Sequence, residues 1–123
     1  MLYYAKSSIS GVLTDAEVRE ALCGVFACLG AKRRVLAIPP DFTRLNSFGG
    51  EITAIANDYY GDALTDILPA LGTHSPMTPE QMDIMFAGVP HGKFRVHDWR
   101  GGVEMVGEVP AEYIREISEG RVS

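Results

Sequence analysis

His74 is the residue of this chain whose type and position best suit proton transfer. It follows an apolar run, Ile67-Leu68-Pro69-Ala70-Leu71, and a helix start comes soon after it, at Thr78. This order predicts a strand, a loop and a helix, and such a loop lies at the carboxyl end of a strand, where ligands bind in α/β sheets. Imidazoles titrate near neutral pH and suit general acid or base chemistry. The alternative is a histidine that only satisfies backbone groups of its own loop.

A second strand end carries a carboxylate, a hydroxyl and a guanidinium. The run Arg34-Val35-Leu36-Ala37-Ile38 is typical of a short buried strand, and Pro39-Pro40-Asp41-Phe42-Thr43-Arg44 follows it. If the two strands are parallel neighbours, one rim of the sheet carries Asp41, Thr43, Arg44, Thr73 and His74. An arginine there is a good fork for a carboxylate or phosphate. The plain alternatives are a local ion pair of Asp41 with Arg44 and threonines that only close their loops.

The other histidines and the cysteines form no recognisable site. His97, beside Asp98, and His91, in a Pro-His-Gly segment, are better explained as turn and loop features. The sequence contains no His-Glu-x-x-His, Cys-x-x-Cys, P-loop, Gly-x-Gly-x-x-Gly or Gly-x-Ser-x-Gly motif. No residue is therefore assigned to a metal. From the residues alone, the sequence predicts an anion-binding α/β rim with one acid/base candidate.

Capping and periodicity predict the elements that position this rim. A capping box at Thr14 and a stop at Gly30 predict a first helix. A capped start at Thr78, with proline next, predicts a later one. We expect helices at 15–29, 51–60, 79–87 and 110–118, and strands at 34–38, 66–71, 93–97 and 103–107. Residues 64–71 also fit a helical period, and Pro69 counts against a central strand. The order predicts an α/β fold with a Rossmann-like, mostly parallel sheet flanked by helices.

Composition restricts the class of protein further. The 123 residues suffice for one domain, and 11 basic against 16 acidic residues argue against a nucleic-acid partner. No apolar run reaches the roughly 20 residues that span a bilayer, and the N-terminus does not resemble a signal peptide. On a helix, Cys23 and Cys28 lie too far apart for a disulfide. A cytoplasmic protein with reduced, structural cysteines is expected.

Two segments together resemble motifs of the lactate racemase family, the nickel-pincer nucleotide enzymes. They are Pro40-Asp41-Phe42-Thr43-Arg44 and Gly72-Thr73-His74-Ser75-Pro76-Met77-Thr78. Val96-His97-Asp98-Trp99 and Gly107-Glu108-Val109-Pro110 also resemble that family's N-terminal domain, so the similarity runs from about residue 34 onward. In this order and spacing the motifs are fairly specific. Ser75 stands where an arginine is frequent in relatives, which leaves the identity of the hydroxy acid open.

The resemblance implies a racemase or epimerase of 2-hydroxy acids that works by proton-coupled hydride transfer. The family's cofactor is a nickel-pincer nucleotide tethered to a lysine, and a histidine takes the hydroxyl proton while hydride moves to the cofactor. By this resemblance, His74 is one of two acid/base histidines and Arg44 binds the substrate anion. The implied cofactor-binding residues are Asp41, Phe42, Thr43 and Arg44.

The family's remaining functional residues would lie beyond Ser123. They are the second acid/base histidine, the lysine that carries the cofactor and the histidine that binds nickel. We therefore expect residues 1–123 to form the N-terminal part of a lactate-racemase-like catalytic domain, incomplete and inactive alone. Its expected partner is a small 2-hydroxy acid rather than a nucleic acid or a membrane. The alternative is a non-catalytic α/β module that binds a nucleotide, an anion or a partner chain, and that self-associates through surfaces the missing part would cover.

Overall fold

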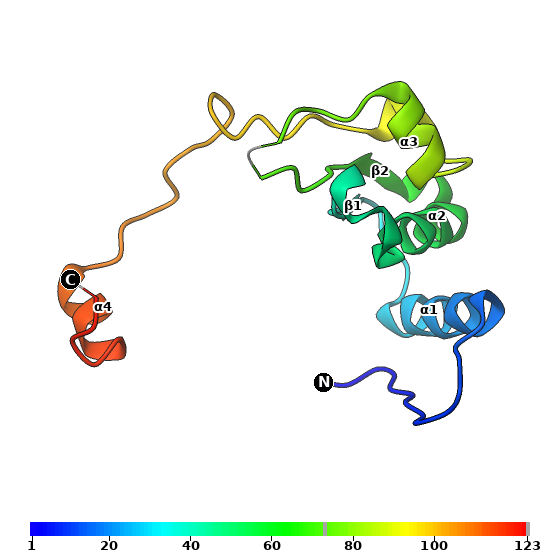
Figure 1. Cartoon of the computed structure of the whole chain (residues 1–123), viewed down its shortest axis with the longest axis horizontal. Helices are drawn as coiled ribbons and strands as arrows, with labels where there is room; N and C mark the ends of the chain where they lie inside the picture. Colours follow the sequence, from blue (N-terminus) through cyan, green and yellow to red (C-terminus); the bar gives the residue numbers. More distant parts are fainter. Residues whose placement is uncertain (73, 123) are drawn as a thin grey trace.

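The computed structural model describes residues 1–72 and 74–122 as a mixed α/β fold with a two-stranded parallel sheet (Figure 1). Its helices are α1 (Asp15–Leu29), α2 (Gly49–Tyr60), α3 (Pro79–Met85) and α4 (Ala111–Ile117), and its strands are β1 (Val35–Ala37) and β2 (Leu64–Ile67). Short 3-10 helices occupy Phe42–Ser47, Gly61–Ala63 and His91–Lys93. The predicted helices are therefore confirmed, with ends that shift by a few residues.

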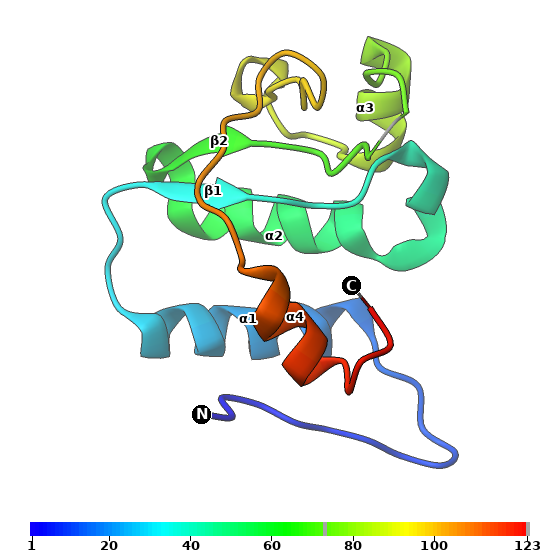
Figure 2. The same ribbon diagram turned by 90° about the vertical axis from the view of Figure 1, so that its left-hand side faces the viewer.

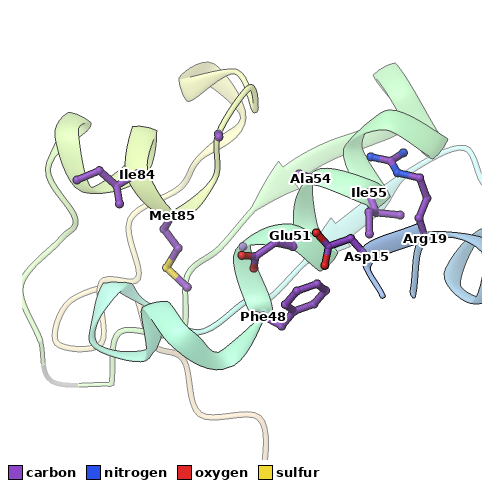
Figure 3. Close-up of a pocket in the computed structure, with 10 residues that line it drawn as sticks. Asp15, Arg19, Phe48, Glu51, Ala54, Ile55, Ile84 and Met85 are labelled. Atoms are coloured by element: carbon purple, nitrogen blue, oxygen red, sulfur yellow. The ribbon is translucent and has the colours of Figure 1, made fainter. Parts of the chain in front are cut away.

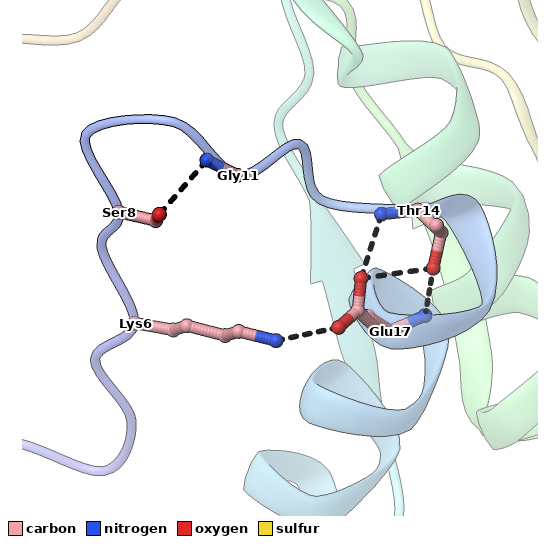
Figure 4. A network of polar contacts seen from close by, with 5 residues as sticks. All are labelled: Lys6, Ser8, Gly11, Thr14 and Glu17. Carbon is pink, nitrogen blue, oxygen red and sulfur yellow. Dashed lines mark hydrogen bonds and ion pairs between the residues drawn. The ribbon is translucent and has the colours of Figure 1, made fainter.

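Helix α1 begins and ends as its sequence predicts. The side chain of Thr14 accepts a hydrogen bond from the Glu17 backbone, and Glu17 reaches back to the backbone N–H of Thr14, which completes the capping box (Figure 4). Lys6 donates a hydrogen bond to the other oxygen of Glu17 and so ties the N-terminal segment to the helix. This hydrogen bond, together with those from Thr14, lowers the pKa of Glu17 to about 2.

The two strands pair in parallel and stay paired beyond their formal ends. Leu36 lies opposite Asp66, and Ala37 lies opposite Ile67. The amide of Leu68 donates to the carbonyl oxygen of Ala37 at 2.8 Å, and a further parallel bridge joins Pro40 to Ala70. The chain therefore leaves both strands at the same end of the sheet, the carboxyl end, as the sequence predicts.

The hydrophobic core lies between one face of the sheet and the helices that cover this face. Leu64, Ile67 and Phe86 are the largest fully buried side chains. Helix α2 runs under the two strands in Figure 2, and Met85 of α3 joins the same cluster. On the opposite face, Leu36 and Ile38 are exposed. Helices thus cover one face of the sheet in the described part of the chain, in a small α/β fold of the predicted class.

Two predicted strands are wrong, and a third is displaced. Residues 93–97 contribute only a bridge between Phe94 and Ile67, and Lys93 belongs to the 3-10 helix His91–Lys93. Residues 103–107 have the alternating pattern of a strand but no strand partner among the described residues, and a strand without a ladder is not stable. The second strand covers Leu64–Ile67 rather than 66–71. Beyond Ile67 the amides of Leu68 and Ala70 still donate to the chain of β1, but Pro39 has no amide hydrogen to donate in return.

Two helical glycines provide a matched test of the packing between α2 and α3. A methyl group at Gly50 would lie 1.8 Å from the carbonyl oxygen of Met85, whereas one at Gly24 in α1 would meet no atom within 4 Å. We expect Gly50→Ala to lower the free energy of unfolding by at least about 2 kcal/mol, because α3 must move away. Gly24→Ala should raise it by roughly 0.5–1 kcal/mol. Urea denaturation measures both, and equal effects of the two substitutions would contradict this packing.

Candidate functional site

The parallel pairing brings the two predicted strand ends together at one surface depression of about 560 Å³. We call it the strand-end rim, and its lining residues are Pro40, Asp41, Thr43, Arg44, Ala70, Leu71, Gly72 and His74. The bridge between Pro40 and Ala70 places the segment after β1 beside the segment after β2. Four of the five side chains that the sequence predicted for this rim are thereby brought together. The fifth, Thr73, lies outside the described residues.

A short hydrogen bond between Asp41 and His74 lies at the centre of the rim. Oδ2 of Asp41 is 2.6 Å from Nδ1 of His74, although the two residues are 33 positions apart in the sequence. The other carboxylate oxygen of Asp41, Oδ1, accepts hydrogen bonds from the hydroxyl of Thr43 and, at 3.2 Å, from the Thr43 backbone. The side chain of Asp41 is only 7% exposed, whereas that of His74 is 53% exposed. A buried carboxylate thus holds an imidazole that faces solvent.

The hydrogen bonds keep Asp41 ionised in spite of its burial. Burial alone favours the neutral acid and raises the pKa. The hydrogen bonds from Thr43 and His74 act in the opposite direction, and together they outweigh burial, so the pKa of Asp41 lies below its ordinary value. Asp41 is therefore a carboxylate at neutral pH, and it can only accept hydrogen bonds.

The contact with Asp41 determines which nitrogen of His74 is available to a ligand. Because a carboxylate has no proton to donate, Nδ1 of His74 must carry the hydrogen in the 2.6 Å contact. In the neutral ring Nε2 then holds the lone pair, and it can take a proton from a bound hydroxyl group. The negative charge of Asp41 would stabilise the imidazolium that forms. This division of roles is the one that aspartate and histidine have in acid/base catalysis.

The backbone before His74 is shaped for this contact. Leu71 is buried and anchors the end of the apolar run, and Gly72 has a φ of 59°, which favours glycine. The amide of His74 then donates to the carbonyl oxygen of Leu71 at 3.0 Å. In the segment that follows β1, Asp41 is the N-cap of the 3-10 helix Phe42–Ser47. One carboxylate therefore both caps that helix and orients His74.

The three residues after Asp41 differ in exposure. Phe42 is half-buried and packs against the core, so its side chain has a structural contact. Thr43 and Arg44 are exposed and line the rim beside His74. Within residues 1–72 and 74–122, Arg44 makes no ion pair, and the predicted alternative of a local pair with Asp41 is wrong because His74 occupies that carboxylate. Arg44 is therefore available to an anion.

Sequence reasoning placed Asp41 and His74 on one rim but did not foresee that they bond to each other. It assigned Asp41 to the cofactor through the family resemblance and treated His74 separately. The signal for the pairing was present, because both residues directly follow predicted parallel strands. What was missing was the register, which brings Pro40 opposite Ala70.

The remaining polar candidates have local structural roles. His91 contacts Asp83 at 2.8 Å on the exposed surface. Asp98 accepts hydrogen bonds from the backbone of Arg100 and Gly101, which confirms the predicted turn. Nζ of Lys32 donates to the carbonyl oxygen of Leu29 at the end of α1, where a cation is favourable. Cys23 and Cys28 are free thiols, also as predicted.

A second cavity, of about 310 Å³, lies between α1, α2 and α3, away from the strand-end rim (Figure 3). Its charged lining residues are Asp15, Arg19 and Glu51. Asp15 and Glu51 each lie in the first turn of a helix, where negative charge is favourable, and Arg19 pairs with Asp58. Sequence reasoning missed this cavity, but the charges around it are explained by helix stability.

Comparisons with known proteins leave the resemblance untested. No protein-family model, no curated protein and no solved structure matches this chain. None of the described helices is both long and apolar enough to span a membrane. The membership in the lactate racemase family therefore stays a prediction from the motifs.

The depressed pKa of Asp41 predicts how acid affects stability. A carboxyl group whose pKa is lower in the folded than in the unfolded chain stabilises the fold above its unfolded value of about 3.9, and this contribution is lost as pH falls through the folded pKa. We expect Asp41→Asn to lower the free energy of unfolding by about 1.5–3 kcal/mol at pH 7. The deficit should shrink toward pH 3.

Urea denaturation between pH 7 and pH 3 measures this difference, with Asp62→Asn on the exposed surface as the matched control. A deficit of Asp41→Asn that stays constant over this range would contradict the role of its charge.

Proposed function

We propose that this chain is the N-terminal part of a lactate-racemase-like enzyme, in which His74 exchanges a proton with the hydroxyl group of a 2-hydroxy acid. The observation that carries this proposal is the 2.6 Å contact between buried Asp41 and exposed His74. A loop histidine that merely satisfied its own backbone would not need a buried carboxylate from another strand end. We further propose that the parallel sheet is part of a larger Rossmann-like domain and that the protein is cytoplasmic.

Different residues of the rim would contact different groups of the substrate. Arg44, exposed and without an ion pair among the described residues, would bind the carboxylate of the hydroxy acid. Nε2 of His74 would accept the proton of the 2-hydroxyl group, while Asp41 holds the ring and stabilises the positive charge. Thr43 has already donated its hydroxyl hydrogen to Asp41, so its role is to support that carboxylate.

The implied nickel-pincer nucleotide fits this chain only in part. Its phosphate would suit the exposed guanidinium of Arg44. However, the described residues contain no group of three or more histidine, cysteine, aspartate or glutamate side chains that could hold a metal ion. The metal thus finds no ligand set in this part of the chain, and we derive no step through the cofactor.

The proposed reaction is tested by His74→Gln in the protein as its host makes it. We expect racemisation of the 2-hydroxy acid to fall roughly 10²- to 10⁴-fold, because the general acid/base is lost. His91→Gln is the matched control, since His91 also contacts a carboxylate, Asp83, but outside the rim. Asp41→Asn should give an intermediate loss. Near-normal racemisation by His74→Gln would overturn the proposed function.

Binding measurements separate this function from the alternative, a non-catalytic module that binds an anion. Calorimetry with lactate as the probe should show that Arg44→Ala weakens binding about tenfold or more, because a charged hydrogen bond is lost. His74→Gln should leave binding within a few-fold. If both variants bind lactate as tightly as the natural protein does, the rim has no anion site. Binding without any turnover in the protein as its host makes it would favour the alternative.

A further inference from the structure

One edge of β1 is unoccupied in the described part of the chain. β1 pairs with β2 on one side, and the carbonyl oxygens of Ala37 and Pro39 accept the hydrogen bonds from that side. Since successive residues of a strand direct their backbone groups to alternate edges, the N–H and C=O groups of Leu36 and Ile38 point to the other edge. Both side chains are also more than half exposed, at 53% and 63%. An edge of this kind is a template for a further strand.

A segment with the pattern of a strand lacks a partner among the described residues of the same chain. Residues 103–109 alternate as Val-Glu-Met-Val-Gly-Glu-Val and form no regular secondary structure. Met105 and Val106 are exposed over 80% or more of their surface. Every hydrogen bond recorded for the described residues 96–122 joins two residues of that same segment. Figure 1 shows this segment, drawn in orange, leading away from the sheet to α4.

The residues before the open edge of β1 and the extended segment 103–109 carry opposite charge. Lys32, Arg33 and Arg34 directly precede β1, and all three residues are exposed. Glu104 and Glu108 lie within the extended segment, and Glu112 follows it. A segment with this pattern laid along the edge of β1 would therefore bring carboxylates near the basic cluster. Complementary charge favours this pairing over association with an acidic surface.

The path of the chain favours a second copy as the source of the added strand. Phe94 pairs with Ile67, and the amide of Arg95 donates to the carbonyl oxygen of Ile67 at 2.8 Å, on the edge of β2 that faces away from β1. The segment therefore leaves its own sheet at the edge opposite to the one it would cover. A copy related by two-fold symmetry can offer its β1 edge to this segment and receive the same contact in return.

We propose that residues 103–109 of one copy add as a strand to the open edge of β1 in a second copy, and that the exchange is reciprocal. Backbone hydrogen bonds to Leu36 and Ile38 provide the pairing, and the apolar side chains of the segment cover the exposed side chains of β1. The charge contact between the glutamates and the basic cluster selects this edge. The proposal does not depend on the chemistry at His74, and it leaves the further strands of the larger sheet to the β2 side, where Phe94 already pairs with Ile67.

Light scattering of the 123-residue chain tests the proposal directly. We expect a mass that rises with concentration toward twice the 13.4 kDa of one chain. Met105→Pro combined with Val106→Pro should shift the protein to the monomer, because adjacent amides face opposite edges and one of the two must pair with β1. The matched control combines Ser8→Pro with Ile9→Pro in the exposed N-terminal segment, which should leave the mass unchanged. A natural chain that stays monomeric, or dimers equally sensitive to both pairs of prolines, would overturn the proposal.

Charge reversal identifies the two surfaces that meet. One variant combines Lys32→Glu with Arg33→Glu, and the other combines Glu104→Lys with Glu108→Lys. Each alone should raise the dimer dissociation constant at least about tenfold, because like charges then face each other. An equimolar mixture should recover the dimer, since both exchanged contacts again join opposite charges. Variants that dimerise alone, or a mixture that stays monomeric while circular dichroism shows folded chains, would overturn the assignment of these surfaces.

Discussion

The parallel pairing of β1 with β2 is the constraint on which the described structure depends. It buries Leu64 and Ile67 against α2 and α3, and it continues far enough to pair Pro40 with Ala70. Because the carboxyl ends of parallel strands lie at the same end of the sheet, the segments that follow them must leave the sheet side by side. The strand-end rim is a direct consequence of this geometry.

Burial of Asp41 then determines how the rim is organised. A carboxylate that loses its contact with water destabilises the fold unless hydrogen bonds replace that contact. Thr43 supplies such bonds from the same segment, and His74 supplies one from the neighbouring strand end. The orientation of the imidazole is therefore part of what makes the buried charge tolerable. In this way a requirement of stability leaves one nitrogen of His74 free to face solvent.

The same small sheet leaves other parts of the chain without partners. With helices on one face only and β1 paired on one edge only in the described residues, Leu36 and Ile38 stay exposed. The segment 103–109 has the composition of a strand, yet nothing within the described chain completes it. The two predicted strands that fail to form and the open edge of β1 thus express one observation, which is that the sheet has two strands among the described residues.

Local signals in the sequence determined the helices and the types of residue at the two strand ends. Capping boxes at Thr14 and Thr78 specify where α1 and α3 begin, because the hydrogen bonds that define them join residues three positions apart. The two strand ends were recognisable from apolar runs followed by Asp41 and by His74. The sequence predicted parallel strands, but tertiary structure alone decided their register and the contact of Asp41 with His74 rather than Arg44. It also decided that residues 103–107 have no ladder among the described residues. These outcomes depend on pairing between residues more than 25 positions apart, which no local pattern encodes.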